Sequence, residues 1–89
     1  MNWDDMRFFL QVARTGRLTE AARALGVDHA TVSRRVGALE RALSARLFDR
    51  SPRGYALTEA GRALMPTAEA MESASMLAAA EVGGRQDEL

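Results

Sequence analysis

Apolar residues near the start of the chain recur at intervals of three and four residues. Positions 3, 6, 9, 10 and 13 are all apolar, and this spacing is typical of one face of an amphipathic helix. Gly16 follows the last of them, as glycine often follows the end of a helix. The pattern predicts a first helix from Trp3 to Arg14.

Two further helices, with a tight corner between them, are predicted from Thr19 to Leu43. Thr19 is a favourable N-cap for a helix that ends at Leu25. Gly26 and Val27 form the corner, and Asp28 then places a carboxylate at the positive end of a third helix. The apolar positions 32, 36, 39 and 43 of that helix form one narrow stripe, which predicts its buried face.

The pattern changes after Ser44, where the apolar stretches are short and apolar and polar residues partly alternate. The segment "RLFDR" is followed by "SPRG" and then "YAL". Proline favours a turn by its restricted φ, and glycine tolerates a positive φ. Together these segments predict a small β-hairpin from Leu47 to Leu57.

A long fourth helix is predicted from Thr58, its N-cap, to about Val82. Pro66 lies inside it and removes a backbone hydrogen bond, which predicts a kink or local loosening there. Apolar residues lie on two sides of this helix, and a second apolar side favours a partner, here a second copy of the chain. The alternative is that the helix folds back on its own domain. The predicted dimerisation residues are Leu64, Met65, Met71, Met76 and Val82.

Charge is distributed unevenly, although the net formal charge is zero. Residues 1–62 contain eleven arginines and seven acidic residues, a net charge of +4, whereas residues 63–89 have a net charge of −4. The chain has no lysine, and arginine presents a planar fork that suits phosphate and guanine. A basic N-terminal part and an acidic C-terminal part of the chain are compatible with a nucleic-acid partner.

Several functional classes are disfavoured by residue type. The chain has no cysteine and one histidine, so neither a disulfide framework nor a zinc site is expected. No nucleophile–base pair, paired carboxylates or phosphate-binding loop is present, so we expect no enzyme, no catalytic residue, no metal and no cofactor. No apolar run approaches the ~20 residues of a membrane span, and no signal peptide is evident. A soluble, cytoplasmic protein is the expectation.

The corner has the residue spacing of a helix-turn-helix. Ala22 is a small residue where two helices would cross, Gly26 is a turn residue four positions later, and Val32 is an apolar residue six positions further on. Successive helical residues are about 100° apart, so the residues on the side of the third helix opposite its apolar stripe can be listed. This outward set is Ala30, Ser33, Arg34, Gly37 and Arg41. His29 lies at the exposed start of the helix.

The outward set predicts contacts to double-stranded DNA, because a helix in the major groove presents its first turns to base edges. Arg34 can fork onto guanine, Thr31 and Ser33 can reach phosphates or bases, and Ala30 can lie against a thymine methyl group. Arg53, at the tip of the predicted hairpin, can enter an adjacent minor groove. The alternatives are a solubilising helix face and an ordinary polar turn.

Two stretches resemble the N-terminal DNA-binding region of LysR-type transcriptional regulators: "MRFFLQVARTGRLTEAARALGVDHATVSRRVGALE" and "LFDRSPRGYALTEAGRAL". The resemblance implies a mainly α fold, a winged helix-turn-helix with a small β-hairpin wing and a long C-terminal linker helix that pairs in a homodimer. It implies three parts: a DNA-binding domain over 1–58, a linker helix over 59–82, and a flexible end over 83–89. A small-molecule effector would act only through a C-terminal domain not present here.

The resemblance also implies roles for individual residues. His29, Ala30, Ser33 and Arg34 match base- and phosphate-contacting positions. Three further residues match other positions: Thr19 a phosphate contact, Arg53 the minor-groove wing residue, and Arg50 a phosphate or structural partner. The chain departs from the family at His29 and Arg35, where glutamine is common, and Arg35 is predicted to add a phosphate contact.

Two other readings of the same residues stay open. The helical hairpin with its long helix is also compatible with a protein-interaction module that has no DNA role. Another winged-helix repressor family is a further alternative. Steep salt dependence of DNA binding separates the first alternative from a DNA-binding role, because phosphate contacts release counterions.

Overall fold

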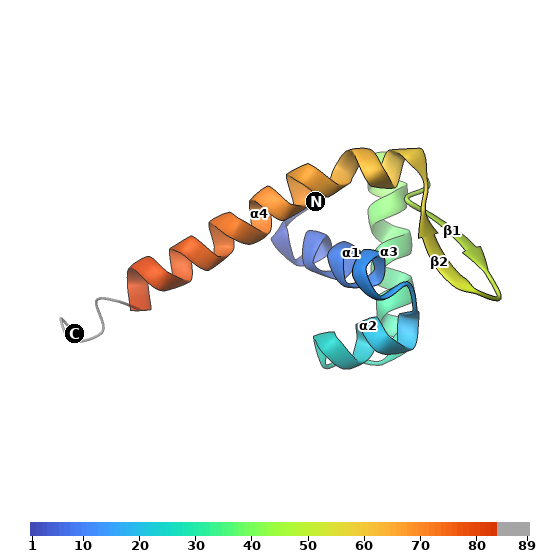
Figure 1. The fold of residues 1–89 in the computed structure, drawn as a ribbon, viewed down its shortest axis with the longest axis horizontal. Helices are drawn as coiled ribbons and strands as arrows, with labels where there is room; N and C mark the ends of the chain where they lie inside the picture. The colour runs from blue at the N-terminus through green and yellow to red at the C-terminus, as the bar shows by residue number, and fades with distance from the viewer. Residues whose placement is uncertain (84–89) are drawn as a thin grey trace.

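A computed structural model of the protein describes residues 1–83, and it is mainly helical (Figure 1). The described residues form four helices and one antiparallel hairpin in which β1 pairs with β2. The bounds are α1 Trp3–Thr15, α2 Leu18–Leu25, α3 His29–Leu43, β1 Phe48–Ser51, β2 Gly54–Leu57 and α4 Glu59–Gly83. This order confirms the predicted winged helix-turn-helix with a long last helix. The predicted flexible end over 83–89 lies, except for Gly83, outside the described residues.

Local capping explains where α1 and α3 begin. At α1, the side chain of Asn2 accepts a hydrogen bond from the Asp5 amide, and the Asp5 carboxylate accepts one from the Asn2 amide. At α3, the Asp28 carboxylate accepts a 2.7 Å hydrogen bond from the Thr31 amide. These side chains satisfy amides that the first helical turn leaves free. The predicted Asp28 cap is confirmed.

The predicted Thr19 cap is wrong. The N-cap of α2 is Arg17, whose side chain makes no capping hydrogen bond, and Thr19 is the second residue of the helix. Gly16 adopts a left-handed conformation with φ 73°, so the chain reverses there and Arg17 becomes the extended residue before the helix. Reversal at Gly16 therefore starts α2 two residues earlier than the side-chain preference of Thr19 suggested.

One hydrophobic core joins the first three helices to the hairpin. The rings of Phe9 on α1 and Phe48 on β1 lie 5.4 Å apart, and Phe48 makes an edge contact with Tyr55 at 5.9 Å. From α3, the predicted stripe is buried at three positions and half-buried at Leu43. The largest fully buried side chains are Phe9, Phe48, Met6, Leu10, Leu47, Val12, Val32 and Val36.

The hairpin is fixed to the end of α1 by a close backbone approach. The Tyr55 amide donates a 2.8 Å hydrogen bond to the carbonyl of Gly16. Gly54 has φ 122°, and a Cβ there would collide with the same carbonyl. Only glycine combines that φ with so close a contact. The wing is therefore held in a definite direction relative to the helices.

The first half of α4 belongs to the same packed unit, and the second half projects away from it (Figure 1). Thr58 caps the helix, as predicted, by accepting a 3.0 Å hydrogen bond from the Gly61 amide. Ala68 is fully buried in the core, and the helix continues through Pro66 without a break. The projecting half accounts for the 51 Å long axis of the molecule.

Candidate nucleic-acid interface

The corner between α2 and α3 has the geometry that its spacing predicted. Ala22 and Val32 are both buried, with 5% and 0% of their surface exposed. Gly26 is left-handed with φ 71°, and the next amide, that of Val27, donates to the Ala22 carbonyl at 3.1 Å. The small side chain, the glycine turn and the apolar contact together hold α3 across α2. Such a crossing leaves the start of α3 on the surface.

The first turns of α3 present the predicted contact residues. His29, Ala30 and Arg34 are exposed, and Thr31 and Ser33 are partly exposed. The positive end of the helix dipole lies at the same place. The hydrogen bond from the Thr31 amide lowers the pKa of the Asp28 carboxyl below its ordinary value of 3.8. Asp28 therefore stays ionised at neutral pH, a negative charge beside an otherwise basic surface.

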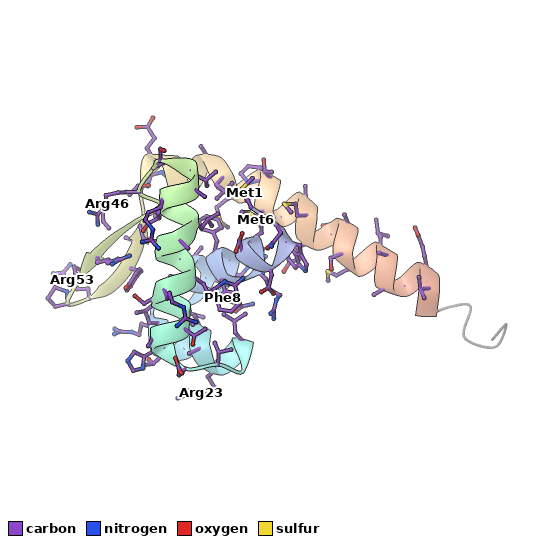
Figure 2. The ribbon with its side chains drawn as sticks, turned by 180° about the vertical axis from the view of Figure 1, so that it is seen from behind. Met1, Met6, Phe8, Arg23, Arg46 and Arg53 are labelled. Atoms are coloured by element: carbon purple, nitrogen blue, oxygen red, sulfur yellow. The ribbon has the colours of Figure 1, made fainter. Side chains whose placement is uncertain are left out.

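A groove of about 630 Å³ is bordered by α3, by the loop over 44–46 and by Arg50 of β1. Figure 2 shows the hairpin beside α3, with Arg53 at its tip and Arg46 at its other end. The polar residues lining the groove include one acid, Glu40, and four arginines: Arg34, Arg41, Arg46 and Arg50. Gly37 also lines it, and a Cβ there would contact the Arg41 guanidinium at 3.5 Å. The lining is thus strongly basic.

Glu40 organises the entry into the wing and engages one of these arginines. One of its carboxylate oxygens accepts hydrogen bonds from the amides of Leu47 and Phe48, at 2.8 and 3.4 Å. The other accepts one from Arg50 at 3.3 Å, and the Arg50 guanidinium lies 5.3 Å from the centre of the Tyr55 ring. Arg50 is therefore held in place by the protein, consistent with the structural role left open for it.

The remaining groove arginines are not engaged in ion pairs with the protein. Within residues 1–83, Arg34, Arg41 and Arg46 form no ion pair. All three are exposed. Their charges are available to an anionic partner that enters the groove.

Arg35, predicted to contact phosphate, points elsewhere. Its guanidinium donates to Asp4 at 2.8 Å and to Asp5 at 3.2 Å. It also lies 4.5 Å from the centre of the Phe8 ring. The hydrogen bond to Asp4, with a further one to Asp5, raises the pKa of Arg35 above its ordinary value. The structure thus places Arg35 with α1 and apart from the groove.

Arg53 and Thr19, two further predicted contact residues, are both exposed. Arg53 is exposed in the turn between β1 and β2, where its amide donates to the Ser51 hydroxyl at 3.2 Å. Thr19 is exposed in the first turn of α2. Both side chains are accessible from solvent, and their contacts to DNA stay predictions.

The predicted dimerisation residues divide into two sets. Leu64, Met65 and Met71 are half-buried and pack against the core of their own domain. Met76 and Val82 are 64% and 73% exposed, and the neighbouring Leu77, which was not among the predicted residues, is 62% exposed. The fold-back alternative therefore describes the first half of α4, and the unpaired apolar residues lie beyond it.

Arg41 belongs to the predicted outward set of α3 but was given no role of its own, and Arg46 was not predicted as a site residue. Arg46 lies in the loop after α3, where no periodicity applies, and only the docking of the hairpin brings it to the groove. No group of three or more potential metal ligands occurs among the described residues. None of the helices described is long and apolar enough to cross a membrane.

This fold is a winged helix-turn-helix. It has a glycine turn between α2 and α3, an α3 that is exposed at its start, and a hairpin wing beside an arginine-lined groove. A family model described as "Bacterial regulatory helix-turn-helix protein, lysR family" matches residues 3–62. That match covers more than half of the 89 residues. The chain therefore belongs to the lysR family, whose members are transcriptional regulators and not enzymes.

Two curated relatives are named as regulators. The chain is 47% identical over 68 residues to an uncharacterized HTH-type transcriptional regulator in the ibpB-leuC intergenic region of Azotobacter vinelandii, covering 76% of this chain and 47% of that protein. It is 39% identical over 84 residues to a probable hydrogen peroxide-inducible genes activator of Mycobacterium xenopi, covering 94% and 44%. The chain spans less than half the length of each relative.

Two solved structures are similar in fold. The CbnR_DBD–DNA complex has a TM-score of 0.85 at 30% identity and covers 94% of this chain and 97% of that chain. OxyR of Corynebacterium glutamicum has a TM-score of 0.90 at 27% identity, covering 96% of this chain and 27% of that one. The likeness to the first extends over nearly the whole of both chains.

Proposed function

We propose that this chain is a sequence-specific reader of double-stranded DNA, with α3 in the major groove and the turn over 51–54 in the adjacent minor groove. The observation that carries the proposal is the arginine-lined groove bordered by α3, the loop over 44–46 and Arg50 at the base of the wing. On a duplex, one phosphate backbone separates the two grooves that α3 and the wing would enter. That backbone has to pass between them, along the groove, where Arg41 and Arg46 contact its phosphates.

Base recognition is assigned to the start of α3. Arg34 forks onto a guanine, which is the commonest specific contact of this residue type. His29 offers one donor and one acceptor when neutral, and Ser33 and Thr31 supply hydroxyls. Ala30 lies against a thymine methyl group, because a longer side chain would hold the helix away from the base edges. Thr19 contacts a phosphate, which fixes the register and carries no sequence information, whereas Arg50 is already paired with Glu40 and supports the wing.

The wing reads the neighbouring minor groove through Arg53. A turn of two residues, Pro52 and Arg53, joins the strands, and Ser51 pairs with Gly54 in the ladder. The backbone hydrogen bond to Gly16 fixes the direction of the hairpin. A narrow A·T-rich minor groove has an enhanced negative potential that attracts arginine. Arg53 therefore favours such sequences beside the major-groove contacts.

The similarity to the CbnR domain supports this proposal, because that domain was crystallised as a DNA complex and shares 30% of its residues with this chain. We extend the proposal to a homodimer joined through the projecting half of α4, where Met76, Leu77 and Val82 are exposed. Two such domains would read an interrupted inverted repeat, with half-sites about one helical turn apart or a multiple of it. We also propose that the protein acts in the cytoplasm and that any small-molecule effector acts through a separate domain.

Selection of bound duplexes from a random DNA pool tests the function directly. Enrichment of a common motif is expected, together with a steep fall of affinity as salt is raised. Arg41→Ala and Arg46→Ala should each lower the slope of log K against log salt by about 0.9 and leave the motif unchanged. Arg41→Lys and Arg46→Lys, which keep the positive charge at each position, should leave both unchanged. Failure to enrich any motif, with salt-independent binding, would favour the protein-interaction module.

A further inference from the structure

Arg34 and Arg35 are adjacent in sequence but point to different neighbours. Arg34 lines the groove, whereas Arg35 pairs with Asp4 and Asp5 at the start of α1. We propose that Arg35 is a positioning residue, not a phosphate contact: it tethers α3 to α1, sets the rotation of α3 and so determines how accurately Arg34 meets its base. The proposal rests on the DNA-binding function given above.

Helix geometry explains why the two arginines serve different purposes. Successive residues are about 100° apart around a helix, since one turn takes 3.6 residues. The core stripe of α3 is formed by Val32, Val36 and Leu39. Arg34 lies on the far side from this stripe, and Arg35 lies on its flank, where its side chain is 30% exposed. Arg35 is thus beside the core and α1, with the groove on the other side of the helix.

The acceptors for Arg35 are themselves held in place. Asp5 belongs to the capping box with Asn2, and Asp4 accepts hydrogen bonds of 2.8 and 3.0 Å from Arg7. Phe8, whose ring lies under the Arg35 guanidinium, is only 3% exposed. Charge-assisted hydrogen bonds to fixed acceptors are directional. Their direction is therefore set by α1 and not by the flexibility of the Arg35 side chain.

The tether fixes the rotation of α3 about its axis, which burial of its core stripe alone does not fix. Hydrophobic burial is non-directional, and the stripe of α3 is narrow, so burial alone tolerates some rotation of the helix. A small rotation displaces Arg34 at the helix surface, and bidentate recognition of guanine depends on geometry. Asp4 and Asp5 are on this view specificity-determining residues, although their charge is repelled by DNA.

The tether and a phosphate contact predict opposite results for removal of the acids. If Arg35 binds phosphate, Asp4→Asn with Asp5→Asn frees it and raises affinity for all duplexes. Arg35→Gln would then lower affinity for all duplexes and reduce the salt slope by about 0.9. If Arg35 is a tether, both changes reduce the ratio of affinities for a selected duplex and a scrambled one. The salt slope of Arg35→Gln then stays as in the unmodified chain.

The experiment measures that ratio for the whole chain, with a duplex selected by the unmodified protein and its scrambled version at one salt concentration. Arg35→Gln and the double Asn variant should each reduce the ratio about two- to tenfold, and the triple variant should reduce it no further, as for residues that act through one contact. Arg62→Gln, which removes the same charge from an exposed residue of α4, is the control and should leave the ratio unchanged. A ratio unchanged by the double Asn variant would overturn the proposal.

A second measurement, without DNA, separates this inference from the proposed function. In urea unfolding, Arg35→Gln and the double Asn variant should each lower the midpoint, and the triple variant should lower it by less than the sum. Additive shifts would show that no tether exists. If the unmodified chain selects no duplex but the shifts are non-additive, the proposed function fails while the tether stands as a structural contact. Unfolding of Arg35→Gln alone, with Arg34→Gln folded, would likewise support the tether over a phosphate contact.

Discussion

Arg14 on α1 and Glu72 on α4 form a doubly hydrogen-bonded ion pair across 58 positions of sequence, with N···O distances of 2.7 and 2.8 Å. The pair lies where α4 leaves the domain, because Ala68 is fully buried and Met76 is 64% exposed. A planar guanidinium that meets a carboxylate through two bonds fixes direction as well as distance. We interpret this pair as the contact that aligns the projecting half of α4.

The first prediction concerns acid stability. The hydrogen bonds from Arg14 lower the pKa of Glu72 below its ordinary value of 4.5. The pair therefore contributes stability above pH 4.5, and this contribution is lost as the pH falls below that value through the lowered folded-state pKa. Glu72→Gln should lower the melting temperature at pH 7, and its profile should merge with that of the unmodified chain in acid.

The control for this measurement is Glu81→Gln, which removes the same charge from the exposed end of α4. Its melting temperature should follow that of the unmodified chain from pH 7 into acid. Thermal unfolding over a pH series, followed by circular dichroism, gives the comparison. A constant offset of Glu72→Gln at every pH would show that the pair does not titrate as described.

The second prediction concerns Gly61, where the usual effect of a helical glycine is reversed. Replacing glycine by alanine inside a helix normally stabilises it by about 0.5–1 kcal/mol. Here a Cβ would collide with the Leu47 carbonyl and the side chain of Leu57. Gly61→Ala should instead destabilise the chain by about 1–3 kcal/mol, as overpacking does. Gly83→Ala is the control, because a Cβ there meets open space. Urea unfolding of both variants measures the difference.

The third prediction concerns base recognition by Arg34. Arg34→Ala should cost about 1–3 kcal/mol on the selected duplex and relax the preference at one base position. Arg41, which faces the same groove, should on replacement by alanine weaken all duplexes alike. Binding profiles over all single-base variants of the selected site provide the measurement. A profile that Arg34→Ala leaves unchanged at every position would remove Arg34 from base readout.

The fourth prediction concerns the wing. Arg53→Ala should weaken binding most on sites with A·T-rich flanks, because only a narrow minor groove concentrates negative potential around an inserted arginine. Paired duplexes that differ in flank alone, titrated with both proteins, measure the effect. Equal losses on A·T-rich and G·C-rich flanks would reduce Arg53 to a phosphate contact.

The fifth prediction concerns assembly. Met76→Glu with Leu77→Glu places two charges on the exposed apolar part of α4 and should give monomers with much reduced affinity for a two-half-site duplex, since avidity is lost. The charge-matched control is Thr67→Glu with Ala70→Glu, two exposed positions on the packed half of the helix. Leu64 and Met71 are unsuitable, because both pack against their own core. Sedimentation of the unmodified chain as a monomer at high micromolar concentration would contradict the proposed dimer.

Much of the local structure was predictable because it depends on neighbouring residues. Gly16 ends α1, Asp28 begins α3, and "SPRG" forms the wing turn, all as the sequence predicts. The three buried positions of α3 follow from periodicity alone. The start of α2 was missed, because the reversal at Gly16 outweighed the capping preference of Thr19.

The sequence by itself determined the helices, the hairpin and the outward face of α3, because caps, turns and periodicity act over a few residues. Only the tertiary structure decided that Arg35 turns to α1 while Arg34 turns to the groove, since that choice depends on acids 30 and 31 positions away. It also decided that Arg46 joins the groove and that Met71 packs against its own core. Periodicity shows that a face is apolar or charged, but which surface meets that face depends on how distant segments pack.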